Sequence, residues 1–146
     1  MSLKEERPAQ TTRKLNPRLG WLGLLGFLGF LGIWSYRAER EVFPFLFFAF
    51  FGFFGFFFEG KMSNILMDER FLENRKNAQL LAYRTGFSLT AMALIASSWG
   101  WLFPSNDGKL LFLTIALSLI YGLVVFLCEY LLYRFDHEEG VEGAYE

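Results

Sequence analysis

Apolar residues in this chain gather in four long blocks that are separated by charged or turn-forming segments. The blocks cover residues 19–36, 42–58, 84–103 and 110–132. A helix needs roughly 20 apolar residues to cross a hydrocarbon core of about 30 Å. Four such blocks in a chain of 146 residues leave too little polar surface to cover them in water. The pattern therefore predicts an all-α integral membrane protein, a four-helix up-down bundle.

The segment between the second and third blocks has the pattern of a helix. No glycine or proline falls between Lys61 and Gly86, and Ser63 or Asn64 could cap a helix start. We expect a cytoplasmic helix over residues 63–83 that leads into the third span. The membrane domain then covers residues 19–132, between a basic tail (1–18) and an acidic tail (133–146).

The distribution of Lys and Arg predicts the orientation. The two tails and the segment between spans two and three carry eleven of these residues, whereas the other two connections carry three. Loops rich in Lys and Arg stay in the cytoplasm. We therefore expect a multi-pass protein of the cell membrane with both termini in the cytoplasm. Net charge is only −1, so composition gives no reason to expect a nucleic-acid partner.

The first block repeats glycine at every third position, as LGWLGLLGFLGFLGI over residues 19–33. On an α-helix, residues three apart are displaced by about 60° around the axis. The glycines should then wind around the helix as a spiral groove instead of lining one face. They allow a neighbouring backbone to come close. The residues of this repeat are Gly20, Gly23, Gly26, Gly29 and Gly32.

The second block offers side chains that could fill such a groove. It contains eleven Phe, with Gly52 and Gly55 three positions apart. We expect spans one and two to form a tight hairpin in which Phe rings lie against glycines. An alternative is that the same surface binds a second copy of the chain or another protein.

Charged side chains in the cytoplasmic segment are the first candidates for an interaction site. They could bind a cation, a lipid head group or a charged loop of a partner, or simply pair with one another on a solvated helix. Carboxylates at this spacing spread over more than one face, which supports a metal site only weakly. The candidates are Asp68, Glu69, Arg70, Glu73, Arg75 and Lys76.

Glu129 is a separate candidate because it interrupts the apolar stretch VVFLCEYLLYRF. An acid inside a membrane span can serve proton or ion coupling. Arg134 marks the end of this span, which puts Glu129 only about 7 Å inside. It could therefore also reach the interface or pair with a cation of the cytoplasmic helix. No cluster predicts a metal or cofactor, and the one cysteine, Cys128, excludes an intrachain disulfide.

Three stretches carry a resemblance to a known family. They are LNPRLGWLG, FFFEGKMSNILMDER and NRKNA. The chain resembles a family of small, four-span bacterial membrane proteins of unknown function, found mainly in Gram-positive bacteria. The resemblance covers most of residues 15–131. It implies four spans, and it implies no reaction, cofactor or functional residue.

The favoured function is that of a non-catalytic membrane protein that modulates or protects a membrane partner, in an accessory, regulatory or immunity-like role. The rival is a subunit of an oligomeric transporter or channel, for which a polar stripe at mid-membrane is expected. An enzyme is disfavoured because no nucleophile–base pair or ligand cluster occurs in the sequence. The expected partners are the lipid bilayer and either a membrane protein or further copies of the chain.

Overall fold

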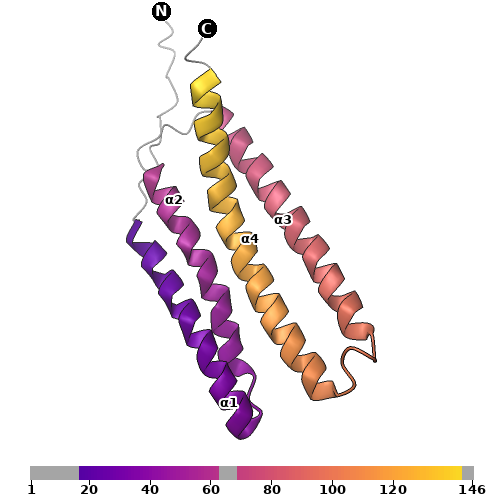
Figure 1. The fold of residues 1–146 in the computed structure, drawn as a ribbon. Helices are drawn as coiled ribbons and strands as arrows, with labels where there is room; N and C mark the ends of the chain where they lie inside the picture. Colours follow the sequence, from indigo (N-terminus) through magenta and orange to yellow (C-terminus); the bar gives the residue numbers. More distant parts are fainter. Residues whose placement is uncertain (1–16, 63–68, 143–146) are drawn as a thin grey trace, which may run out of the picture.

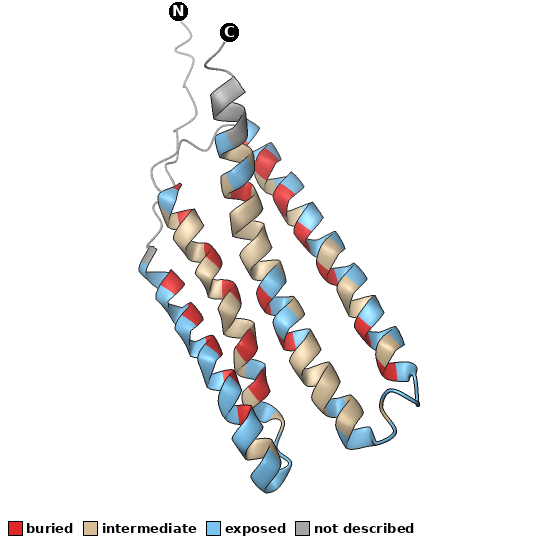
Figure 2. Ribbon diagram, in the orientation of Figure 1, coloured by how far each residue is buried: buried red, intermediate tan, exposed pale blue. Residues whose placement is uncertain are grey.

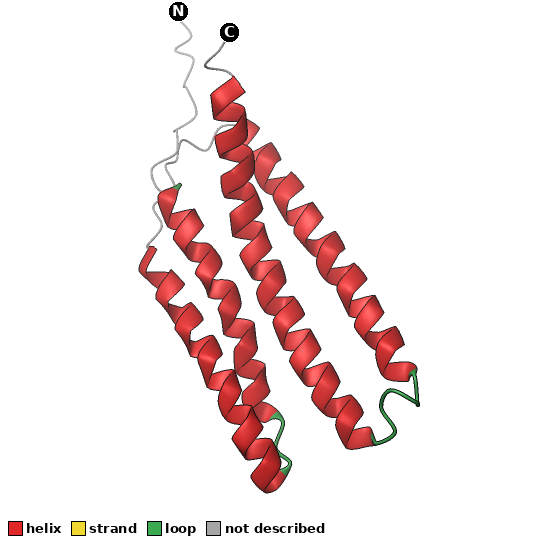
Figure 3. Cartoon of the chain, in the orientation of Figure 1, coloured by secondary structure: helices red, strands yellow, loops and turns green. Residues whose placement is uncertain are grey.

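The computed structural model describes residues 17–62 and 69–142, and its long segments there are all helical (Figures 1 and 3). Four helical stretches are long and apolar enough to cross a membrane. They are Arg18–Glu39, Phe43–Lys61, Glu69–Ser98 and Asn106–His137. The predicted all-α fold with four spans is confirmed, and the chain is a multi-pass membrane protein.

Each of the first two spans begins as a 3₁₀ helix and ends as an α-helix. The first consists of η1 (Pro17–Phe30) and α1 (Leu31–Glu39), and the second of η2 (Phe43–Gly55) and α2 (Phe56–Lys61). A 3₁₀ helix rises about 2.0 Å per residue against about 1.5 Å for an α-helix. The 14 residues of η1 therefore cover about 28 Å, where an α-helix would cover about 21 Å.

The 3₁₀ geometry overturns the predicted spiral of glycines. With three residues per turn, positions i and i+3 are eclipsed, so a period of three puts every glycine on one face. All five glycines of the first span are buried, whereas the residues between them in η1 are exposed (Figure 2). The prediction was wrong because it assumed 3.6 residues per turn.

The glycine face of the first span packs against phenylalanines of the second span, as expected for a hairpin. A Cβ atom added to any of these glycines would lie less than 3.0 Å from a ring carbon of the facing phenylalanine. We call this contact the Gly–Phe interface. Its pairs are Gly20 with Phe57, Gly23 with Phe54, Gly26 with Phe51, Gly29 with Phe48 and Gly32 with Phe45.

The rings of the Gly–Phe interface also stack on one another along η2. Phe48 and Phe51 have ring centroids 5.9 Å apart and planes inclined by 19°, and Phe51 and Phe54 are 6.2 Å apart at 18°. Three steps of about 2.0 Å give this spacing. The 3₁₀ helix thus aligns both partners of the interface, glycines in one row and rings in the other.

The third and fourth spans are α-helices throughout. Helix α3 (Glu69–Ser98) enters its span without a break, as expected for the cytoplasmic helix, and Ser63 and Asn64 lie outside the described residues. It ends before Phe103, the expected limit, since Trp99 already donates to the Ala96 carbonyl in a turn at 3.2 Å. Helix α4 (Asn106–Glu142) starts after Ser105, whose Oγ accepts the Gly108 N–H at 3.1 Å.

The helices lie in the spatial order first, second, fourth, third span (Figure 1). Helix η2 packs between η1 and α4, and α3 packs along the opposite side of α4. The starts of η1 and α3 and the ends of α2 and α4 lie at one end of the molecule (Figure 1). The links around Arg40 and Gly100 lie at the other end, in agreement with an up-down course (Figure 3).

Two small-residue contacts join the neighbouring helices. A Cβ atom added to Gly52 of η2 would lie 2.6 Å from the Gly122 carbonyl oxygen of α4. One added to Gly86 of α3 would collide with the Val124 side chain of α4. At the end of the molecule where α3 begins, Met62, Phe71, Ala78 and Leu132 form a buried apolar cluster.

Candidate functional site

Two carboxylates lie along the contact between α2 and α4. Glu59, in the first turn of α2, is only 3% exposed, and Glu129 of α4 is half-buried. The Oε1 atom of Glu59 and the Oε2 atom of Glu129 are both shielded from solvent. A Cβ atom added to Gly55 would lie 3.2 Å from the Glu129 Cβ, and Gly55 is one helical turn before Glu59. The two acids therefore belong to the same part of this interface, and both take part in interactions with other residues.

Aromatic rings cover the same interface on the side of Lys61. The Phe58 ring of α2 has its centroid 5.3 Å from that of Tyr130 and 5.5 Å from that of Tyr133. The Lys61 ammonium lies 5.6 Å from the centroids of both Phe58 and Tyr133. A cation over two aromatic faces is stabilised by the ring quadrupoles. This arrangement places a positive charge at the helix end, two residues beyond Glu59.

Glu129 also borders a pocket of about 260 Å³ at the junction of α4 with α3. Gln79 and Tyr83 of α3 contribute an amide and a phenol to its lining, and Cys128 contributes a thiol. A carboxylate with these neighbours can accept a proton or hydrogen bonds. Among the side chains described for residues 18–62 and 69–137, no three His, Cys, Asp or Glu are arranged to hold a metal ion.

Six hydroxyl groups of spans three and four bond to backbone carbonyls of their own helix. Ser97 donates to Leu94 and Ser118 to Thr114, at 2.8 and 2.6 Å. The same bonding is made by Thr85, Ser88, Ser98 and Thr114. These hydroxyls therefore make their hydrogen bonds within one helix and do not form a polar row between helices.

The charged candidates of the segment between spans two and three lie on the first turns of α3, at a distance from the two carboxylates. Glu69, Arg70, Glu73 and Lys76 are exposed and Arg75 is half-buried, while Asp68 lies outside the described residues. Ala78 packs in one cluster with Leu132, so the candidates before it in α3 lie alongside the part of α4 beyond that residue. The structure therefore does not gather them around Glu129.

Sequence reasoning missed Glu59 and Asn74. Asn74 is 6% exposed and lies on the face of α3 that also buries Phe71 and Ala78. Its burial could have been found from the spacing of three and four residues to these apolar neighbours. Glu59 follows Gly52 and Gly55 on the face toward α4, but this face becomes visible only once the partner helix is known.

Comparison with known proteins gave no significant match to a protein family, to a curated protein or to a solved structure.

Proposed function

We propose that this protein is a non-catalytic membrane protein that binds a partner in the bacterial cell membrane and modulates or protects it. The proposal includes the orientation with both termini in the cytoplasm. The proposed binding of a partner rests above all on helix α3, which packs along α4 and lies at one edge of the four spans.

The edge helix carries large side chains that no other part of the described chain covers. Phe87 is 79% exposed, Met92 65% and Ile95 58%. Together with α4, this helix borders an apolar groove of about 530 Å³ that includes Gly86, Phe87 and Leu117. An apolar groove between two helices can receive a ridge of side chains from another transmembrane helix. The same helix continues into the exposed charges around Glu73, which could fix the orientation of a partner.

The hydroxyl groups argue against the rival function of a transporter or channel subunit. A hydrophilic path needs polar groups that are available to the transported solute, and the carboxylate Glu129 lies near one end of its span. The hydroxyls of α3 and α4 named above are bonded to their own backbone instead. This observation favours an interaction protein over a conducting one.

Photocrosslinking in native membranes tests the proposal. A benzophenone amino acid at Phe87 should give a discrete crosslinked species, whereas the same group at Ala93, which is 7% exposed, should give none. Charge reversal at Glu73 and Lys76 should weaken the crosslink. Equal labelling from both positions would contradict a specific partner. Specific solute flux through the pure protein in liposomes would favour the rival function.

A further inference from the structure

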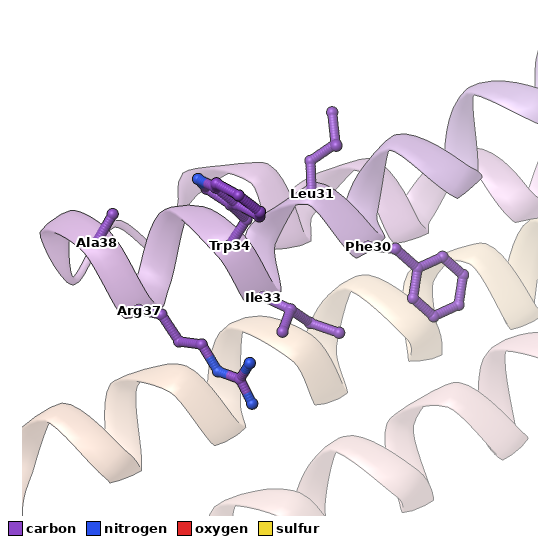
Figure 4. A pocket seen from close by; sticks show the side chains of 6 residues that line it. All are labelled: Phe30, Leu31, Ile33, Trp34, Arg37 and Ala38. Carbon is purple, nitrogen blue, oxygen red and sulfur yellow. The ribbon is translucent and has the colours of Figure 1, made fainter.

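A groove of about 640 Å³ runs beside the end of the first span, around helix α1 (Figure 4). Its walls are mostly apolar, and one guanidinium group contributes to the lining. The lining residues are Phe30, Leu31, Ile33, Trp34, Arg37 and Ala38. Phe30, Ile33 and Arg37 point to the same side of the helix in Figure 4. Because these residues follow one another at helical spacing, the Cα atom of Arg37 lies about 10 Å along the axis from that of Phe30.

Arg37 and Arg40 are both near this end of the span but differ in their surroundings. The Arg40 Nη1 donates to the Tyr36 hydroxyl at 3.3 Å, and its guanidinium lies 5.2 Å from the Tyr36 ring centroid. Arg37 is exposed and lines the groove, and its guanidinium makes no hydrogen bond or ion pair within the described part of the chain. Its donors are therefore available to a molecule in the groove.

The groove combines two chemical features of one class of ligand. Its apolar walls, with Phe30 53% and Ile33 48% exposed, match an acyl chain. A guanidinium group binds phosphate oxygens through paired hydrogen bonds. Trp34 is 81% exposed, and such indole rings are enriched at the level of lipid head groups. Glu39 and Glu41 follow in the chain, but neither lines the groove.

We propose that this groove binds an anionic phospholipid, with an acyl chain along Phe30 and Ile33 and the phosphate on Arg37. The occupant is a lipid because the groove opens beside a membrane span and needs a ligand that is apolar over most of its length and anionic at one end. The anionic head group matches the charge of Arg37.

Fluorescence quenching of Trp34 tests this site in the full-length protein. Changing Trp21, Trp99 and Trp101 to Phe leaves Trp34 as the single indole. The protein is reconstituted in phosphatidylcholine vesicles that contain a small fraction of phospholipid with brominated acyl chains. Brominated phosphatidylglycerol should quench Trp34 at a lower mole fraction than brominated phosphatidylcholine does. Both leaflets carry the quencher, so the result does not depend on orientation.

Two arginine variants separate a specific site from a general attraction to charge. Arg37→Gln should reduce the preference for the anionic lipid about tenfold, which is the effect of losing one charge-assisted contact. Arg40→Gln removes a cation from the same end of the span and should retain the preference. Equal quenching by both brominated lipids in the parent protein would overturn the proposal, and so would equal losses in the two variants. If Arg37→Gln fails to fold, the comparison of the two brominated lipids in the parent protein still tests the proposal.

Discussion

At the scale of single residues, the glycines of the first span matter because a side chain has no room there. Each faces a ring of the second span at a distance that a methyl group would violate. Glycine is unfavourable inside a helix by about 1 kcal/mol relative to alanine. At these positions, however, the close packing of glycine against the phenylalanine rings outweighs this cost.

Replacement of Gly26 by Ala is expected to destabilise the protein. The new methyl group would collide with the Phe51 ring, and overpacking of this kind costs about 1–3 kcal/mol. Thermal unfolding followed by tryptophan fluorescence in lipid nanodiscs measures the effect. Gly100→Ala is the matched control, because no atom lies within 4 Å of a Cβ atom added to Gly100. A Gly26→Ala protein as stable as this control would contradict the Gly–Phe interface.

Glu59 is expected to contribute to stability, although a charged residue is unfavourable in most buried places. Its side chain is 3% exposed and interacts with other residues. Glu59→Ala would remove these interactions from a buried site, at a cost of about 1–3 kcal/mol. Glu69→Ala removes an exposed acid and should change stability by less than about 0.5 kcal/mol. Thermal unfolding in nanodiscs compares the stability of the two variants. Equal losses of stability would show that burial of Glu59 has no energetic consequence.

At the scale of elements, the 3₁₀ segments follow from matched periods in two neighbouring spans. On an α-helix, the contact face of a three-residue repeat would turn by about 240° between Gly20 and Gly32. Five straight contacts with an equally spaced row of rings would then be impossible. In the 3₁₀ form both rows are straight, so every glycine can meet a phenylalanine. The packing gained along the hairpin stabilises a helix type that is uncommon beyond three or four residues.

Distance measurements between spin labels test the helix type directly. Leu19 and Leu31 are exposed and twelve residues apart, and their Cα atoms should be about 24 Å apart in 3₁₀ geometry. An α-helix would separate them by about 18 Å. Leu80 and Met92 of α3 are equally far apart in sequence and exposed, and should show the α-helical value. Double electron–electron resonance resolves distances of about 24 and 18 Å. Identical distance distributions for the two labelled pairs would contradict the 3₁₀ assignment.

The sequence predicted the four spans from hydropathy, and it predicted a hairpin in which rings meet glycines. It could not predict the straight glycine row, because the period of three was interpreted in the geometry that helices normally adopt. The equal spacing of Phe48, Phe51, Phe54 and Phe57 in the second span was the available indication of a shared 3₁₀ geometry. The burial of Glu59 was not predictable, since it depends on the position of α4.

At the scale of the whole molecule, the order of the spans in space follows from contacts between distant parts of the sequence. The second and fourth spans come together where Gly52 meets Gly122, and the third span joins the fourth where Gly86 meets Val124. Hydropathy identifies spans but gives no information on their neighbours. The end of the third span and the start of the fourth, by contrast, follow local turn and capping signals around Trp99 and Ser105.

Replacement of Gly122 by Leu should separate the two helix pairs. Its backbone approaches the Ala49 carbonyl oxygen so closely that an added Cβ atom would lie 3.1 Å from it. A leucine there would force η2 and α4 apart and cost at least about 1–3 kcal/mol. Limited proteolysis and unfolding in nanodiscs should both detect the change. Leu123→Ala alters the neighbouring residue, which is exposed, and should have a much smaller effect. Similar losses in both variants would argue against close contact of η2 with α4.

The orientation in the membrane is expected from the cation distribution and can be tested in intact cells. The links around Arg40 and Gly100 lie at one end of the molecule, and the start of α3 lies at the other (Figure 1). The end with more Lys and Arg should be cytoplasmic. In a Cys128→Ser background, a membrane-impermeant maleimide should label Gly100→Cys from outside and should reach Lys76→Cys only after the cells are opened. Labelling of Lys76→Cys in sealed cells with protection of Gly100→Cys would invert the topology. It would also place Arg37 and its proposed lipid in the inner leaflet.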